Sequence, residues 1–368
     1  MPKKVKIVFE NKKTFLALTN YQLDNILIGD IIFNTSVVGY QEVLTDPSYS
    51  LQILVFTFPL IGTYPIYPKN FNESKKIQPL AVIVNQIESF PVNNLKNNDQ
   101  FIDFSTWTEE NNIPVLFNVD TRALTKYIRD NGASKVAIAP APTPTSKLLL
   151  LLEKTKLNNH VQKISQDKDS KFIFIDQKAP KTLVIYDIGV KNSIINYFKN
   201  FNLNLIIVPW DTKYQDLKKY HPNAYFFSNG PGDPHDLKNV IGEIKEMIKN
   251  NETVLGICLG HQLIGLALGF EVKRLPFGHH SINHPVQNLI SKKVFITSQN
   301  HDYYLDLANK NKILMDKKIV FNYISLLDLS NEGIESEDGR IYSVQFHPEA
   351  APGPEECVDI FKEFYKRI

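Results

Sequence analysis

The feature that most constrains the fold is a regular alternation of short apolar strands and helical segments that begins near Lys181. The apolar runs TLVIYDI, LNLIIVPW, AYFF and TVLGI are separated by stretches with helical periodicity, one of them at about residues 239–250. Continuously apolar strands that alternate with helices indicate a parallel sheet covered on both faces. In such sheets ligands bind at the carboxyl ends of the strands, so polar residues at those ends are the first candidates for a site.

The first third of the chain has a different pattern. KIVFE, TFLAL, ILIGDIIFNTS, LQILVFTFP and PLAVIVNQI are rich in β-branched and aromatic residues, with turn residues between them. One helix is expected there, TRALTKYIRDNGA, with Gly132 at its C-cap. We therefore expect a smaller, β-rich α+β domain at residues 1–145, a linker region at 146–180, and an α/β domain at 181–368. The Pro-rich stretch PAPTPTS at 140–146 marks the start of the linker, and a Leu-rich helix follows it.

Charge and apolar patterning exclude several classes of function. The chain has 41 basic and 39 acidic residues in 368, so its overall charge provides no electrostatic attraction to nucleic acid or to an anionic membrane. The leucine run at residues 148–152 is far too short to span a membrane, and the N-terminal apolar stretch is too short for a signal peptide. Two cysteines cannot form a disulfide framework. We predict a soluble cytoplasmic protein, or one of the plastid stroma if it is organelle-encoded, with no nucleic-acid or membrane partner.

Cys258 lies between two glycines in the stretch TVLGICLGHQ, where an apolar strand runs directly into a helix. The spacing G-x-C-x-G matches the tight strand-to-helix turn that exposes a nucleophile. A helix N-terminus favours a thiolate, and the N–H of Leu259 is placed to stabilise an oxyanion. On this motif alone, a small buried hydrophobic cysteine remains the alternative to a nucleophile.

The candidate base is His347, which follows the strand IYSVQF. Glu349, two residues further on, can orient the imidazole and complete a Cys-His-Glu triad. After another apolar strand, Gly230 and Gly232 in SNGPGDP allow a close backbone approach and a second oxyanion donor. The lysine and hydroxyl of a phosphate-binding P-loop are missing from this stretch.

Three ordered motifs, SNGPGDP, GICLGHQ and HPE, resemble those of the class I (triad) glutamine amidotransferases. Four further stretches, FNTSVVGYQEVLTDPSYS, NVDTRALTKYIRDNGA, FGHHSINHPV and HPEAAPGP, resemble the small, glutamine-hydrolysing subunit of carbamoyl-phosphate synthetase. The resemblance spans nearly the whole chain. It implies a class I amidotransferase domain with a mostly parallel sheet flanked by helices, preceded by the small-subunit N-terminal domain.

The resemblance also implies a reaction and its partners. L-glutamine is hydrolysed through a γ-glutamyl thioester on Cys258, with His347 moving protons and Glu349 orienting it. Ammonia passes through a tunnel to a large subunit that uses bicarbonate, ATP and Mg to make carbamoyl phosphate for arginine and pyrimidine synthesis, in a heterodimer or a higher assembly of heterodimers. This chain itself needs no cofactor. The alternatives are another amidotransferase glutaminase, such as that of anthranilate synthase, and a catalytically impaired binding subunit.

By the same resemblance, eight residues line the glutamine pocket: Ser48, Gly230, Gly232, Leu259, Gln262, Asn300, Asp302 and Tyr303. Asp302 departs from the family, which usually has glycine there. An aspartate adds a charge and disfavours a positive φ, so glutamine affinity depends on this position.

Other residues that could carry chemistry are expected to be structural. Asp187, Gly189 and Lys191 match a family motif at a strand-to-helix turn. Cys357 falls on the apolar face of a terminal helix, where it is expected to pack in the core. The histidines of GHHSINH lack a cysteine or carboxylate at ligand spacing, so we expect no metal site at His279, His280 and His284.

Overall fold

The computed structural model describes all 368 residues except 69, 92–100, 159, 165–171, 176–177 and 307–316. The chain divides into two compact units, Met1–Leu157 with Pro276–His280, and Asn158–Leu275 with Ser281–Ile368. Residues 146–180, expected to form a linker region, therefore contribute elements to both units.

The first unit is built on a seven-stranded sheet with the strand order β2-β1-β9-β3-β4-β6-β8. Its strands are β1 (Lys3–Phe9), β2 (Thr14–Thr19), β3 (Leu27–Asn34), β4 (Gln52–Phe56), β6 (Ala81–Ile83), β8 (Val115–Leu116) and β9 (Lys135–Pro140), and a separate pair is formed by β5 (Leu60–Ile61) and β7 (Gln86–Ile87). β3, β4, β6 and β8 run parallel to one another, whereas β1, β2 and β9 pair antiparallel. The carboxyl ends of four parallel strands thus meet at one edge of this sheet.

The helices of the first unit are α1 (Tyr40–Thr45), α2 (Phe104–Glu110), α3 (Thr121–Asn131) and α4 (Thr145–Lys154). The prediction of α3 is confirmed, with Asp120 at its N-cap and Gly132 at its C-cap. The Leu-rich helix is also confirmed, since Leu148 and Leu152 of α4 are buried against the sheet. α1 and α2 were not predicted, because helices of six and seven residues complete too few turns to establish a periodic apolar face.

The second unit is built on a ten-stranded sheet with the strand order β10-β12-β11-β13-β14-β19-β18-β17-β15-β16. Its strands are β10 (Ile173–Ile175), β11 (Lys181–Asp187), β12 (Leu203–Pro209), β13 (Ala224–Phe227), β14 (Val254–Ile257), β15 (Val272–Asn288), β16 (Val294–Leu305), β17 (Ile319–Ser325), β18 (Asn331–Ser336) and β19 (Ile341–Val344). The five central strands from β12 to β19 are parallel, as predicted. β10 pairs antiparallel with β12, and beyond β19 the pairs β19·β18, β18·β17 and β17·β15 are antiparallel.

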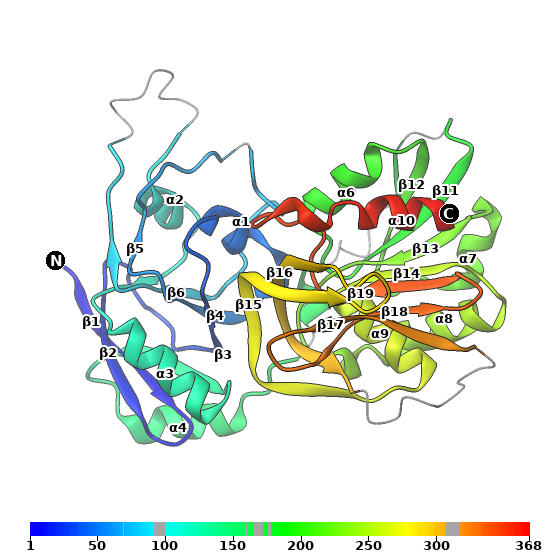
Figure 1. Ribbon diagram of the computed structural model, residues 1–368. Coiled ribbons are helices and arrows are strands. Elements are labelled where there is room, and N and C mark those ends of the chain that lie inside the picture. The colour runs from blue at the N-terminus through cyan, green and yellow to red at the C-terminus, as the bar shows by residue number, and fades with distance from the viewer. Residues whose placement is uncertain (69, 92–100, 159, 165–171, 176–177, 307–316) are drawn as a thin grey trace. The chain divides into compact units, whose positions relative to one another are not determined.

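Helices cover both faces of this sheet (Figure 1). They are α5 (His160–Ile164), α6 (Asn192–Lys199), α7 (Tyr214–Leu217), α8 (Lys238–Lys249), α9 (Leu259–Leu268) and α10 (Ile360–Arg367). Alternate side chains of β11 enter different cores: Leu183 packs in the cluster with α6 and α10, and Val184 packs in the cluster with α8 and α9. A strand buried on both faces explains why the sequence reads as a continuous apolar run.

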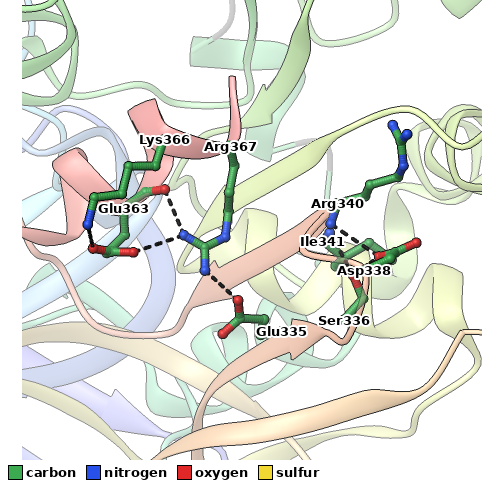
Figure 2. A network of polar contacts seen from close by, with 8 residues as sticks. All are labelled: Glu335, Ser336, Asp338, Arg340, Ile341, Glu363, Lys366 and Arg367. Atoms are coloured by element: carbon green, nitrogen blue, oxygen red, sulfur yellow. Dashed lines mark hydrogen bonds and ion pairs between the residues drawn. The ribbon is translucent and has the colours of Figure 1, made fainter.

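The C-terminal helix α10 is held against the sheet by a network of polar contacts (Figure 2). The Arg367 guanidinium donates to Glu335 of β18 and lies over the Tyr342 ring of β19, 4.2 Å from its centroid. The turn between the same two strands is closed by Ser336, whose hydroxyl oxygen accepts from Ile341 N at 2.9 Å. Together these contacts fix β19, the strand that leads into the candidate site.

Candidate functional site

Cys258 occupies the turn between β14 and α9 with φ 55° and ψ −106°, a conformation that non-glycine residues rarely adopt. Gly256 and Gly260, on either side of this turn, leave no room for a side chain. A Cβ on Gly256 would lie 2.8 Å from the carbonyl carbon of Gly260, and a Cβ on Gly260 would lie 2.0 Å from Phe227 O. The predicted tight turn is therefore confirmed, and its strain is concentrated at the sulfur-bearing residue.

His347 is brought beside this turn by the pairing of β14 with β19. The two strands run parallel with Ile257 opposite Val344, and Cys258 N donates to Val344 O at 2.9 Å. His347 follows three residues after the end of β19, and its Nδ1 lies 2.6 Å from Glu349 Oε1. Cys258, His347 and Glu349 are each 2 to 3% exposed, so all three are shielded from bulk water.

Lys191 is the member of this cluster whose role sequence reasoning missed. Its Nζ lies 3.0 Å from Glu349 Oε1 and donates to Ala350 O at 2.8 Å. The side chain is 2% exposed. The sequence feature that could have indicated this role is the position of Lys191 shortly after β11, at the same carboxyl edge of the sheet as Cys258.

Opposing charges determine the protonation states of the cluster. Burial raises the pKa of Glu349, but Lys191 and His347 outweigh burial and lower it to about 2. Burial lowers the pKa of His347, but Glu349 and Cys258 outweigh it and raise this pKa to about 10. At neutral pH the cluster therefore holds a glutamate anion between two cations, and the imidazolium can act as a proton donor.

The Cys258 sulfur lies 3.5 Å from the backbone oxygen of Asn300 on β16. Gln262 is one turn into α9, and its Nε2 donates to Tyr303 O at 2.9 Å and to Gln345 Oε1 at 3.1 Å. The structure thus brings Asn300 to the Cys258 sulfur. It also ties the Gln262 amide group to β16 and to the loop before His347.

The loop after β13 approaches the start of α9 closely. Gly260 N donates to Ser228 O at 2.9 Å. A Cβ on Gly230 would lie 1.9 Å from Ile188 O, and Gly232 has a φ of +93° with His160 3.0 Å from its Cβ position. Space therefore requires glycine at both positions, beside Leu259, the buried first residue of α9, and the place of Gly230 and Gly232 in a glutamine pocket stays a prediction.

Asp302 and Tyr303 lie within β16. The expectation that Asp302 replaces a glycine of positive φ is wrong for this chain, because Asp302 is not among the described residues with positive φ. Its extended backbone suits any side chain, so the substitution adds a charge without backbone strain. Burial raises the pKa of Tyr303 above its usual range, and its hydroxyl hydrogen-bonds to Asp233.

Ser48 and Cys357 are two further residues that the sequence analysis singled out. Ser48 belongs to the first unit, in the short 3-10 helix Pro47–Tyr49, where its N–H donates to Asp46 Oδ1 at 2.9 Å. Its place in a glutamine pocket stays a prediction. Cys357 lies in the short 3-10 helix Glu355–Cys357, so the expectation that it falls on the terminal helix α10 (Ile360–Arg367) is wrong. It packs in the same apolar cluster as α10, and burial raises its pKa to about 12, which confirms the core assignment.

Comparison with known proteins places the chain in a family. Residues 184–367 match glutamine amidotransferase class-I, and residues 7–138 match the carbamoyl-phosphate synthase small chain, CPSase domain. The carbamoyl phosphate synthase small chain of Clostridium perfringens is 38% identical over 99% of this chain and 99% of its own length. The chain belongs to the family of carbamoyl phosphate synthase small chains.

Other similar proteins include the carbamoyl phosphate synthase small chain of Fusobacterium nucleatum, 37% identical over 93% of this chain and 92% of its own. Among solved structures, a glutamine amidotransferase from Thermotoga maritima is 19% identical with a TM-score of 0.37, covering 50% of this chain and 82% of its own. In the described part of the chain, no helix is long and apolar enough to cross a membrane.

Proposed function

We propose that this chain is the glutamine-hydrolysing subunit of a carbamoyl phosphate synthase and that Cys258 is its nucleophile. The observation that carries the proposal is the strained turn at Cys258 beside a buried His347–Glu349–Lys191 charge network. A merely structural cysteine needs neither a φ of 55° nor a buried cationic histidine nearby.

In the first half of the reaction, Cys258 acts as a thiolate paired with the His347 imidazolium, and its sulfur attacks the γ-amide carbon of glutamine. The amide oxygen takes up negative charge, which the N–H groups of Leu259 and Gly232 stabilise. His347, already protonated, gives its proton to the amide nitrogen. The C–N bond then breaks, ammonia leaves, and a γ-glutamyl thioester remains on Cys258.

In the second half, the now neutral His347 accepts a proton from water. The resulting hydroxide adds to the thioester carbon, the C–S bond breaks, and glutamate leaves while the sulfur regains its negative charge. Glu349 keeps the imidazole in one orientation and stabilises its cation. Lys191 holds Glu349 ionised, so it acts as a positioning residue through Glu349.

Ammonia then passes to a large subunit that consumes bicarbonate and ATP with Mg, giving carbamoyl phosphate for arginine and pyrimidine synthesis. This chain contributes no cofactor to that chemistry. The relatives that support the proposal are named small chains of carbamoyl phosphate synthase, and they match this chain over nearly its full length.

The test compares two nitrogen sources in the complex of this chain with its large subunit. The unmutated complex is expected to make carbamoyl phosphate from glutamine and from ammonia. Cys258→Ser is expected to abolish the glutamine-dependent reaction and to leave the ammonia-dependent one. If the unmutated complex uses ammonia but never glutamine, the chain is a catalytically impaired binding subunit. Asp302→Gly then identifies whether the added carboxylate is the cause, because it restores glutamine use only in that case.

A further inference from the structure

A pocket of about 730 Å³ opens at one edge of the first unit's sheet, in the unit that does not contain Cys258. The parallel strands β4, β6 and β8 end at this edge, and each chain segment that follows supplies a lining residue: Thr57, Asn85 and Asp120. This edge is the usual place for ligands in open sheets with parallel strands, and the volume falls within the usual range for small-molecule pockets.

The helix that follows β8 lines the pocket with positive charge. Arg122, Lys126 and Arg129 of α3 are spaced four and three residues apart, so they share one face of the helix. Arg129 forms an ion pair with Asp130 at 2.8 Å. Within the described ranges, Arg122 and Lys126 have no hydrogen-bond or ion-pair partner. Two cations are therefore available to an incoming ligand.

Two hydroxyl groups on the same helix add unused hydrogen-bonding capacity. Thr121 is 3% exposed and lines the pocket, yet its hydroxyl has no partner among the residues that the structure describes. Thr125 Oγ1 is buried and also lacks a partner within the same part of the chain. Burying a polar group without a partner opposes folding, so such groups point to a ligand that completes them.

The opposite rim of the pocket is held in a defined shape. Asn85 Nδ2 donates to Val119 O at 2.9 Å, and Asn118 N donates to Asn85 O at 2.9 Å. The carboxylate of Asp120 accepts from Ala123 N at 2.8 Å, as the N-cap of α3. The single carboxylate in the lining is thus engaged with the helix, and the lining as a whole is positively charged.

We propose that this pocket binds a phosphate-bearing small molecule. A guanidinium fork, an ammonium and hydroxyl donors together suit a phosphate group, which accepts several charge-assisted hydrogen bonds at once. The volume exceeds that of one phosphate, so the remainder takes an organic group. Pro59 and the threonine methyl groups provide an apolar wall for it.

Isothermal titration calorimetry of the full chain tests the proposal, with ATP, pyrophosphate and inorganic phosphate as probes. We expect saturable binding that the double substitution Arg122→Gln with Lys126→Gln weakens by about tenfold or more. Lys147→Gln, an exposed lysine of α4 in the same unit, is the matched control and is expected to change nothing. ATP binding more tightly than pyrophosphate assigns a nucleotide, and equal binding assigns the phosphate group alone.

Thr125→Val separates a ligand role from a structural one, because valine keeps the shape and removes only the unpartnered hydroxyl. We expect weaker probe binding with an undiminished melting temperature. Malonate, which carries two carboxylates and no phosphate, is the control ligand. The proposal is overturned if no probe binds, if the double variant binds the probes as the unmutated chain does, or if malonate binds as tightly as pyrophosphate. If no probe binds, co-purification of the double variant with the large subunit is measured as well. Loss of co-purification then identifies the pocket as a contact with another protein and not as a ligand site.

Discussion

Replacing Lys191 with methionine removes one of the two cations beside Glu349 and keeps most of the apolar stem of the side chain. Nζ lies 3.0 Å from Glu349 Oε1, a distance at which two unit charges attract by about 5 kcal/mol at an effective dielectric constant of about 20. The pKa of Glu349 is about 2 instead of 4.5, which corresponds to about 3 kcal/mol shared between Lys191 and His347. The variant also leaves Ala350 O without this donor.

We expect Lys191→Met to lower the free energy of unfolding by about 3 kcal/mol, because removing one partner of a buried pair leaves the other charge uncompensated. The lowered pKa of Glu349 contributes stability that is present above pH 4.5 and lost as the pH falls through about 2. In the variant the folded-state pKa of Glu349 lies closer to 4.5, so less stability is lost and the loss is complete at a higher pH. The acid limb of glutaminase kcat/KM is therefore expected to move up by about one to two pH units.

Urea unfolding and the pH profile of glutamine hydrolysis measure these two effects. The matched control is Lys213→Met, which breaks an ion pair of nearly equal length, 2.9 Å to Glu243 Oε1, at a lysine whose side chain is 60% exposed. Solvent screens that pair, so neither unfolding nor the pH profile is expected to change. If Lys191→Met behaves as Lys213→Met does, Lys191 has no role in holding the triad.

Two further substitutions test the burial of Glu332 and the tight turn at Cys258. Burial raises the pKa of Glu332 to about 8, although Gln299 donates to it at 2.9 Å, so folding retains a proton that the unfolded chain loses above pH 4.5. In the unmutated chain this difference lowers the free energy of unfolding between pH 4.5 and 8, by about 4 to 5 kcal/mol in all, and Glu332→Gln is expected to remove that loss. Chemical unfolding at pH 5 and at pH 8 measures it. An unchanged pH dependence in the variant contradicts the raised pKa of Glu332. Gly260→Ala places a Cβ 2.0 Å from Phe227 O and is expected to abolish glutamine hydrolysis. Its control is Gly242→Ala in α8, where the new Cβ meets nothing within 4 Å and should raise stability by about 0.5 to 1 kcal/mol; equal activity in both variants contradicts the steric argument.

Local patterns were sufficient for much of the fold. The parallel strands of the second unit and the helix at α3 were predicted because apolar periodicity is a property of neighbouring residues. The short helices α1 and α2 escaped prediction for lack of repeated turns. The boundary between the units, at Leu157 and Asn158, could not be predicted from local sequence either, because it depends on which sheet each segment packs against.

By itself the sequence pointed to the residues that we propose as nucleophile and base. Gly256 and Gly260 flank Cys258 because no side chain fits there, and His347 and Glu349 are close enough in the chain to pair wherever they are placed. Only the tertiary structure decided the electrostatics of the site. Sheet order brings Lys191 to a carboxylate more than 150 residues away, and burial then makes that contact strong enough to keep Glu349 ionised. Charge coupling depends on distance and on exclusion of water, and neither can be read from residue order.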